Sequence, residues 1–431
     1  MALQLKILNC MWYILIKNIA QYSLFFRLSY TELAATLIQI SFFKAKDMLE
    51  LPSKLPDLGV TIFSTMSALA QKLGALNLSQ GFPDFAAPPA LIEALNRASQ
   101  NGFNQYAPGD GLPVLRGLVA DLYQQRDQLM IDPFEEITIT PGATIAIFCA
   151  IQATVRAGEE VIIFDPSYDS YGPAVQLVGA KPVHIALQHP DFSVDWNQVK
   201  DTINDRTRMI VVNTPHNPSG SVWSKADWQQ LIELIRERNI VVLSDEVYEH
   251  LVFDGVQHYS AWSFPELRER SFVIGSFGKT FHVTGWKTGF CIAAPALMKM
   301  FRQIYQFASF CGVTPVQVAL AEYMQLHPEH IPELSSFYQN KRDLFNSSIE
   351  TSRFKWTPSQ GTYFQNLDYS EIRPELDDLS MCHFLAEQHG IVAIPVSAFY
   401  QHPPTDLRLL RFCFAKKEQT LIQAGQILSK V

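Results

Sequence analysis

The chain has 431 residues, of which 48% are hydrophobic and 18% charged, and its formal net charge is −8. This length allows two domains of ordinary size, and the composition is that of a globular protein rather than a disordered one. The negative charge gives no support to nucleic-acid binding. Six cysteines are scattered without a C-x-x-C pair, so we expect reduced thiols in a cytoplasmic protein, and neither a disulfide framework nor a metal site.

Residues 1–47 differ from the rest because they are rich in Leu, Ile, Phe and Tyr. Charged residues interrupt every window, so no uncharged apolar stretch of about 18 residues is available to span a bilayer. Residues 6–16 resemble the start of a signal peptide, but no convincing small-residue cleavage site follows. Three interpretations stay open: translation that starts at Met48, a peripheral extension, and a targeting segment.

Beyond this extension we expect three parts. Residues 48–89 pack beside a small α+β domain at 315–431, and residues 90–314 form a large domain. In the large domain, apolar runs alternate with helical patterns such as the one at 226–238. The candidate strands are residues 160–164, 209–213, 240–244 and 271–275. Apolar strands without alternation indicate an α/β fold, in which helices cover both faces of a mostly parallel sheet.

In such a sheet, ligands bind outside the carboxyl ends of the strands, where two turn-like motifs occur. Gly142, Ala143 and Thr144 open an apolar helix at 145–155, and bare N–H groups at a helix start can bind an anion. In the loop at 213–220, prolines and a glycine present the amides of Asn213 and Asn217, which can donate to a phenolate or carboxylate oxygen. Each motif taken alone also fits an ordinary turn.

Two further strand ends carry charge. Asp245 ends a buried strand, where a carboxylate needs a cation, and Tyr248 follows one expected helical turn later. The alternative for Asp245 is a helix N-cap. Lys279 follows the strand at 271–275, and burial together with Lys287 predicts a lowered pKa and an amine able to attack a carbonyl. The alternative for Lys279 is a surface lysine beside a glycine turn.

One ligand, pyridoxal 5′-phosphate (PLP), accounts for all four motifs. Its phosphate pairs with residues 142–144, Ser276 and Lys287, its pyridinium nitrogen with Asp245, its phenolate oxygen with Tyr248 and Asn217, and its aldehyde with Lys279. A carboxylate beside the ring nitrogen keeps that nitrogen protonated, so that the ring can withdraw electrons.

Taken together, the motifs resemble those of class I aminotransferases of PLP fold type I. Within that family they are most similar to bacterial methionine aminotransferases and to kynurenine–glutamine aminotransferases. The resemblance runs from about residue 51 to the C-terminus. The matching stretches are NLSQGFPDF at 77–85, NQYAPG at 104–109, PGAT at 141–144, DPSYDSY at 165–171, NTPHNP at 213–218, SDEVY at 244–248, SFGK at 276–279, GWK at 285–287 and LRFCFAK at 410–416.

The resemblance implies roles for single residues around the cofactor. Lys279 holds the cofactor covalently and later moves a proton. Asp245 pairs with the pyridine nitrogen, while Tyr248 and Asn217 bond the phenolate oxygen. Tyr168 matches the aromatic residue that stacks on the ring.

The same resemblance assigns substrate and subunit contacts. Arg411 clamps the α-carboxylate of the substrate, helped by the backbone of Gly81 and by Asn213 or Asn217. Tyr106 matches a tyrosine that reaches the cofactor phosphate of the neighbouring subunit, so we expect a homodimer with shared sites.

The expected activity is therefore a PLP-dependent transamination, in which the amino group of methionine or another apolar or aromatic amino acid moves to a 2-oxo acid. Glutamine stays a possible donor, while Thr144, where some relatives have an aromatic residue, puts kynurenine in question. Residues 62, 63 and 66 are candidates for the side-chain wall, and no second arginine is evident for aspartate. A PLP-dependent carbon–sulfur β-lyase is the alternative. A PLP-binding regulator would need a basic winged-helix domain that residues 1–47 do not supply.

Overall fold

The computed structural model describes residues 51–56 and 58–431. The three interpretations of residues 1–47 therefore lie outside the described residues. The chain divides into two units, Met1–Pro56 and Asp57–Val431, and the fold below is that of the second unit. Among its helices, none combines the length and the apolarity that crossing a bilayer requires.

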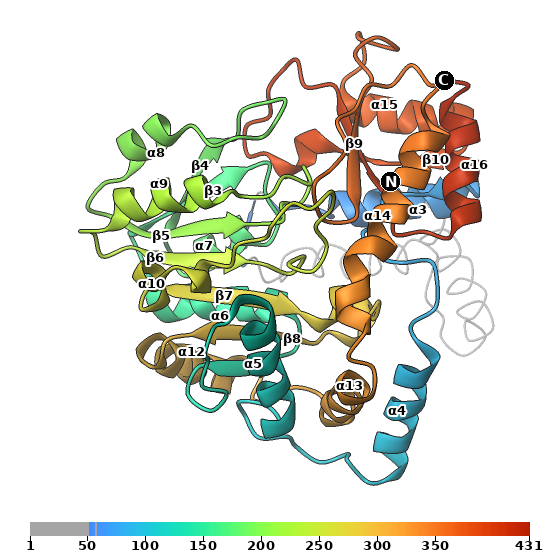
Figure 1. The fold of residues 1–431 in the computed structure, drawn as a ribbon. Helices are drawn as coiled ribbons and strands as arrows, with labels where there is room; N and C mark the ends of the chain where they lie inside the picture. Colours follow the sequence, from blue (N-terminus) through green and yellow to red (C-terminus); the bar gives the residue numbers. More distant parts are fainter. Residues whose placement is uncertain (1–50, 57) are drawn as a thin grey trace, which may run out of the picture. The chain divides into compact units, whose positions relative to one another are not determined.

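A seven-stranded sheet forms the centre of the large part of this unit (Figure 1). Its order is β2-β8-β7-β6-β5-β3-β4, and β8 alone runs against its neighbours β2 and β7. The strands are β2 (Ile137–Thr140), β3 (Glu160–Asp165), β4 (Lys181–Ala186), β5 (Thr207–Asn213), β6 (Val241–Asp245), β7 (Ser271–Ser276) and β8 (Gly289–Ala293). The predicted mostly parallel sheet is confirmed, and the four expected strands match the observed ones to within two residues.

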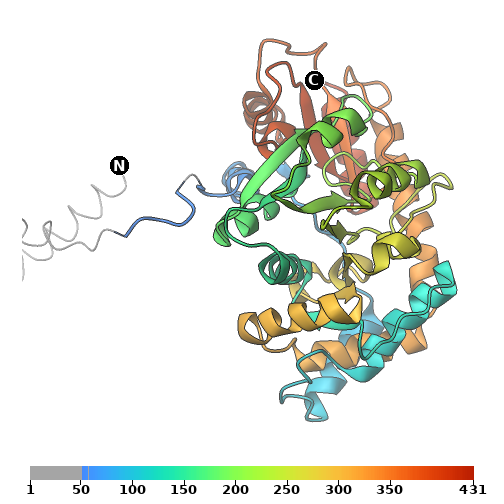
Figure 2. The same cartoon turned by 90° about the vertical axis from the view of Figure 1, so that its left-hand side faces the viewer.

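Helices cover both faces of this sheet (Figures 1 and 2). One face packs against α6 (Ala143–Thr154), α7 (Tyr171–Leu177) and α12 (Pro295–Ala308). The other packs against α4 (Pro89–Gln100), α5 (Pro113–Asp127), α8 (Trp196–Thr202), α9 (Lys225–Ile235) and α13 (Thr314–Leu326). Along β3, the side chains of Val161 and Ile163 pack on the face covered by α6, α7 and α12, while those of Ile162 and Phe164 pack on the opposite face. Side chains alternate between the faces, so a strand that is buried on both sides is apolar throughout.

A second core lies around a smaller antiparallel sheet of order β11-β12-β9. Its strands are β9 (Phe364–Asp368), β11 (Ile394–Pro395) and β12 (Leu409–Cys413), and β1 (Leu76–Asn77) pairs in parallel with β10 (Ile391–Val392) nearby. The helices around it are α3 (Ile62–Leu73), α14 (His330–Ser348), α15 (Asp378–Phe384) and α16 (Glu418–Leu428). Met66 and Leu78 belong to this core. The bounds 48–89, 90–314 and 315–431 for the parts stay a prediction.

The local structure after two strands matters for the site. The expected helix after β6 is wrong: residues 246–251 form successive turns, in which the N–H of Glu249 bonds the carbonyl of Glu246 at 2.9 Å and that of Leu251 bonds Tyr248 at 2.8 Å. Asp245 therefore caps no helix. After β7, by contrast, Lys279 lies in the one-turn helix α11 (Phe277–Thr280).

Candidate active site

A cavity of about 340 Å³ lies at the carboxyl ends of β5, β6 and β7. It brings together nearly all of the predicted site residues. These are Gly81, Gly142, Ala143, Thr144, Tyr168, Asn213, Asn217, Asp245, Tyr248, Ser276, Lys279, Lys287 and Arg411. Tyr106 is the predicted residue that lies elsewhere: it is 81% exposed, and its ring packs edge-on against Phe310 at 5.2 Å.

Lys279 projects its amine into a site of aromatic rings. Its Nζ donates to the hydroxyl of Tyr363 at 2.8 Å and lies 5.6 Å from the centre of the Tyr248 ring. Burial, reinforced by the charges of Lys287 and Arg411, lowers the pKa of the Lys279 amine to about 8. Such an amine is partly neutral near physiological pH, and only the neutral form attacks a carbonyl.

Asp245 accepts a hydrogen bond from a residue that the sequence analysis left without a role. The hydroxyl of Tyr171, in the first turn of α7, donates to Oδ2 of Asp245 at 2.5 Å. Burial raises the pKa of Asp245 to about 6, and the hydrogen bond from Tyr171 opposes this rise. The motif at 165–171 holds two tyrosines, and the need of a buried carboxylate for a hydrogen-bond donor is the signal that could have identified the second of them, Tyr171.

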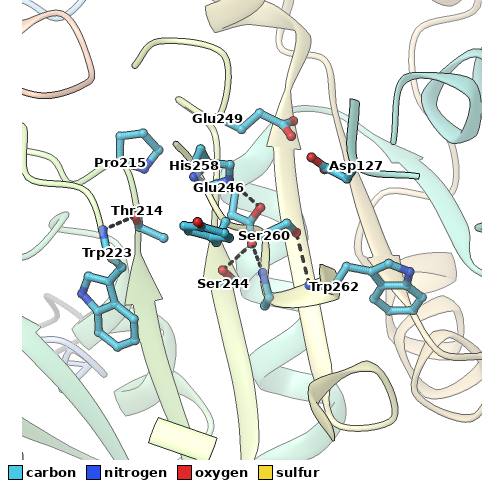
Figure 3. Close-up of polar contacts among 12 residues, drawn as sticks. Asp127, Thr214, Pro215, Trp223, Ser244, Glu246, Glu249, His258, Ser260 and Trp262 are labelled. Carbon is cyan, nitrogen blue, oxygen red and sulfur yellow. Dashed lines mark hydrogen bonds and ion pairs between the residues drawn. The ribbon is translucent and has the colours of Figure 1, made fainter. Parts of the chain in front are cut away.

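The turn after Asp245 is held by a buried carboxylate (Figure 3). Glu246 is fully buried, and its oxygens accept from the hydroxyl of Ser244 at 2.7 Å, from the N–H of Ala261 at 2.9 Å and from Nε2 of His258 at 3.0 Å. Three bonds to one carboxylate fix the backbone on both sides of it. Asp245 and Tyr248 are therefore presented by a rigid turn instead of a helix.

Glu246, Glu249 and His258 also offer three potential metal ligands within 4.8 Å of one another. A guanidinium already supplies positive charge there, because Nη1 of Arg126 donates to Glu249 at 2.7 Å. Glu249 is thus already paired with a cation, and Glu246 accepts three hydrogen bonds, while Nδ1 of His258 has no partner among the described residues.

The start of α6 forms a cradle with Lys287. Gly142 precedes the helix with a φ of 85°, and no side chain caps the helix N–H groups. A Cβ on Gly142 would lie 3.3 Å from Nζ of Lys287, so the ammonium lies directly against this helix start. Bare N–H groups, the helix dipole and an ammonium together favour a phosphate. The hydroxyl residues Thr144 and Ser276 line the same cavity.

Arg411 lies on β12 and is 1% exposed. Its Nη1 donates to Oδ1 of Asn217 at 2.7 Å and its Nη2 to the carbonyl of Ser79 at 3.1 Å, while the ring centre of Phe364 lies 3.9 Å from the guanidinium carbon. Nε has no partner among the described residues. Burial lowers the pKa of Arg411 to about 10. Since two of five N–H groups are used, the rest can bind a carboxylate.

The side chains of Asn213 and Asn217 differ in which of their hydrogen-bonding groups are already used within the protein. Nδ2 of Asn213 donates to the carbonyl of Asp245 at 2.9 Å, and its Oδ1 accepts from the N–H of Asn217 at 2.9 Å. Asn213 thus holds the loop against β6, whereas a direct substrate contact by it stays a prediction. Asn217 uses Oδ1 for Arg411 and keeps its amide N–H groups for a ligand.

PLP and an amino acid fit the cavity if their anionic groups balance the charges of the side chains that line it. Lys279, Lys287 and Arg411 are the cations among its lining residues, and Asp245 is the anion, which leaves a surplus of two positive charges when all are ionised. Arg411 is buried and Lys279 half-buried, and such cations are costly unless anions join them, whereas Lys287 lies exposed at the rim. A phosphate at Lys287 and a carboxylate at Arg411 supply those anions, so the residues present fit the group.

The family model for class I and II aminotransferases matches residues 74–425. The chain belongs to the class I and II aminotransferase family, and it is an enzyme of the aminotransferase type. The fold class and the family predicted from the sequence are confirmed.

Particular members of the family are similar over most of their length. Methionine aminotransferase of Escherichia coli is 46% identical over 379 residues, which cover 88% of this chain and 98% of the relative. Kynurenine–oxoglutarate transaminase 1 of Mus musculus is 33% identical, covering 82% and 91% of the two chains. The crystal structure of YbdL from Escherichia coli, identified as a methionine aminotransferase, superposes with a TM-score of 0.87 at 46% identity and covers 89% of this chain and all of that one. These relatives lend no support to the β-lyase alternative.

Proposed function

We propose that the protein is a PLP-dependent transaminase that moves the amino group of methionine, or of another apolar or aromatic amino acid, to a 2-oxo acid. The observation that carries this proposal is the cavity itself. It combines an amine of lowered pKa on Lys279, a buried carboxylate on Asp245, a phosphate cradle at Gly142 and Lys287, and the guanidinium of Arg411.

The positions of these side chains in the cavity indicate the chemical role of each. When bound, PLP supplies an aldehyde for the amino group and a ring that withdraws electrons from the substrate Cα. The carboxylate of Asp245 holds the proton on the ring nitrogen, with the hydroxyl of Tyr171 keeping that carboxylate ionised. Arg411 orients the substrate carboxylate, and the neutral amine of Lys279 takes the proton from Cα.

The lining of the cavity supports an apolar donor. Phe63, Phe82 and Phe364 line it, the rings of Phe63 and Phe364 lie beside Arg411, and Arg411 is the one arginine among its lining residues. A donor with a second carboxylate would lack a cation there, whereas a thioether or an aromatic ring packs well on phenyl groups. The methionine aminotransferase of Escherichia coli, by its name, has such a substrate.

We further propose a homodimer in the cytoplasm. The exposed ring of Tyr106 lies with Phe310 at a surface that also exposes Phe103 and Val313, and apolar side chains of this kind suit a subunit interface. The cysteines of the described chain are free thiols, as a reducing compartment favours.

Two measurements test the activity. Apoprotein mixed with PLP is expected to develop a visible absorption band that Lys279→Ala lacks. A panel of amino donors against several 2-oxo acids is expected to rank methionine above aspartate. Pyruvate and ammonia released from cystathionine without any added oxo acid would instead show the β-lyase.

A further inference from the structure

We propose that Tyr363 is a positioning residue for the transamination, whose hydroxyl holds the amine of Lys279 in one orientation whenever that amine is not joined to the cofactor. The inference rests on the proposed function, because it assigns a partner to the lysine that the function requires. Tyr363 lies just before β9, within the second core, and is outside every motif that the sequence analysis singled out.

The direction of the hydrogen bonds defines what the hydroxyl does. The hydroxyl of Tyr363 donates to the carbonyl of Gly81 at 2.5 Å, and Nζ of Lys279 lies 2.8 Å from the same hydroxyl. Burial raises the pKa of Tyr363 well above its usual value, so the phenol keeps its proton. Because that one proton points at Gly81, the oxygen can meet Lys279 only as an acceptor. The lysine is therefore the donor of this bond.

The ring that carries the hydroxyl is itself fixed. Tyr363 is 1% exposed and packs edge-on against Tyr248 at 5.1 Å and against Phe364 at 4.8 Å. The preceding residue, Thr362, has a φ of 68°, a left-handed conformation that is strained for a β-branched residue. The N–H of Thr362 bonds the carbonyl of Leu251 at 3.0 Å, which holds the strained backbone in place.

Three separate segments thus meet at one oxygen atom. Lys279 comes from α11 after β7, Tyr363 from the second core, and Gly81 from the segment before α4. A free lysine side chain samples many rotamers, and ordering it costs free energy at the moment of reaction. An amine that already donates one N–H to a fixed oxygen has lost much of this freedom in advance, so its lone pair is presented to an incoming carbonyl in fewer orientations.

Tyr338 supplies a matched control. Its ring belongs to the same aromatic cluster, 5.9 Å from the ring of Tyr363, and is fully buried. Its hydroxyl pairs with Nδ1 of His282 at 2.9 Å. Tyr338→Phe therefore removes a buried hydroxyl from the same core while leaving the bond between Tyr363 and Lys279 in place.

The experiment measures how fast apoprotein captures PLP at a series of pH values, by stopped-flow absorbance. In this step the neutral Nζ of Lys279 attacks the aldehyde carbon, a carbon–nitrogen double bond replaces the carbon–oxygen double bond, and the oxygen leaves as water with the two protons of the amine. For Tyr363→Phe we expect two changes. The pH midpoint of the rate falls below that of wild type, because the lost acceptor had stabilised the ammonium form. The plateau rate at high pH, where the amine is neutral in both proteins, falls about tenfold because its orientation is lost.

The controls separate the possible failures. Tyr338→Phe is expected to keep the midpoint and the plateau of wild type, even if both variants unfold at a lower temperature. Profiles of Tyr363→Phe and wild type that coincide would overturn the role of Tyr363 alone. Wild-type apoprotein that captures no PLP, or a Lys279→Ala variant that captures it equally well, would overturn the proposed function itself.

If Tyr363→Phe does not fold, 3-fluorotyrosine at position 363 keeps the ring and weakens the acceptor. If the pH midpoint of PLP capture by the 3-fluorotyrosine protein equals that of wild type, the proposal is likewise overturned.

Discussion

Burial acts in opposite directions on two charged groups that line the same cavity. It lowers the pKa of Lys279 to about 8 and raises that of Asp245 to about 6, because in both cases the charged form loses its water. Both groups therefore titrate near neutral pH in the apoprotein. A lysine in a model peptide, by contrast, has a pKa of about 10.4.

The pH dependence of PLP capture follows from these two values. Below about pH 8 Lys279 is mostly an ammonium ion, so the capture rate is expected to rise with pH and to level off above that point. Below about pH 6 Asp245 gains a proton and can no longer pair with a protonated ring nitrogen, so the affinity for PLP also falls. Stopped-flow absorbance measures the change of the capture rate around pH 8, and equilibrium titration measures the change of the PLP affinity around pH 6. A rate that keeps rising to pH 10 would contradict the lowered pKa of the lysine.

Asp245→Asn isolates the electrical role of the carboxylate. The substitution keeps the shape of the side chain but removes the charge that holds a proton on the ring nitrogen, so kcat should fall roughly hundredfold or more. Circular dichroism and the unfolding temperature are expected to change little. An Asp245→Asn variant with near-normal turnover would show that the ring nitrogen needs no counter-charge.

Tyr171→Phe tests the hydrogen bond that keeps Asp245 ionised. Removing a donor to a carboxylate costs about 1.5–3 kcal/mol and raises its pKa. The pH below which the affinity for PLP falls should therefore rise by about one unit, while the affinity at pH 8 changes much less. Tyr168, the neighbouring tyrosine of the same motif, serves as a comparison, since its replacement by Phe leaves Asp245 bonded to Tyr171. Equal shifts in both variants would contradict a specific bond.

At the scale of elements, the start of α6 carries the phosphate site, and two glycines allow a clean test of it. Gly142 and Gly158 both have a positive φ, of 85° and 83°. A Cβ at Gly142 would meet Lys287 at 3.2 Å, whereas nothing lies within 4 Å of one at Gly158. Replacing either glycine by Ala strains the backbone by about 1 kcal/mol or more.

Only Gly142→Ala should also weaken PLP binding, by about tenfold, because it displaces the ammonium from the helix start. Fluorescence titration of the two apoproteins with PLP measures the difference, and inorganic phosphate as competitor locates it at the cradle. Equal affinities of Gly142→Ala and Gly158→Ala would contradict the placement of the phosphate.

The central strands and the strand-end motifs were predictable because each depends on local chemistry. Apolar runs bounded by polar residues located β3, β5, β6 and β7, and the helical pattern at 226–238 located α9, which Ser224 begins through a capping box with Asp227. The turns after β6 were not predictable, because they depend on His258 and Ala261, which approach Glu246 from elsewhere in the chain. Tyr363 escaped prediction for the same reason, since its partners lie 84 and 282 residues away.

For the whole molecule, we expect a dimer whose subunits complete each other's sites. Tyr106 lies outside its own cavity and is exposed, as a residue that serves a neighbouring subunit would be. Tyr106→Ala and Lys279→Ala are each expected to be nearly inactive alone. Mixing the two after unfolding and refolding should restore activity, because a hybrid dimer contains one site with both residues intact. Light scattering gives the subunit number, and a mixture without any gain in activity would contradict shared sites.

We expect Lys279 to be the residue that binds the cofactor covalently, and every role proposed for the cavity depends on it. The most direct measurement is to incubate the holoprotein with borohydride, digest it and locate the phosphopyridoxyl group by mass spectrometry. We expect the group on the peptide that contains Lys279, in stoichiometric amount and on no other lysine. A group found chiefly on Lys287 or on a surface lysine, or no group at all, would contradict this expectation.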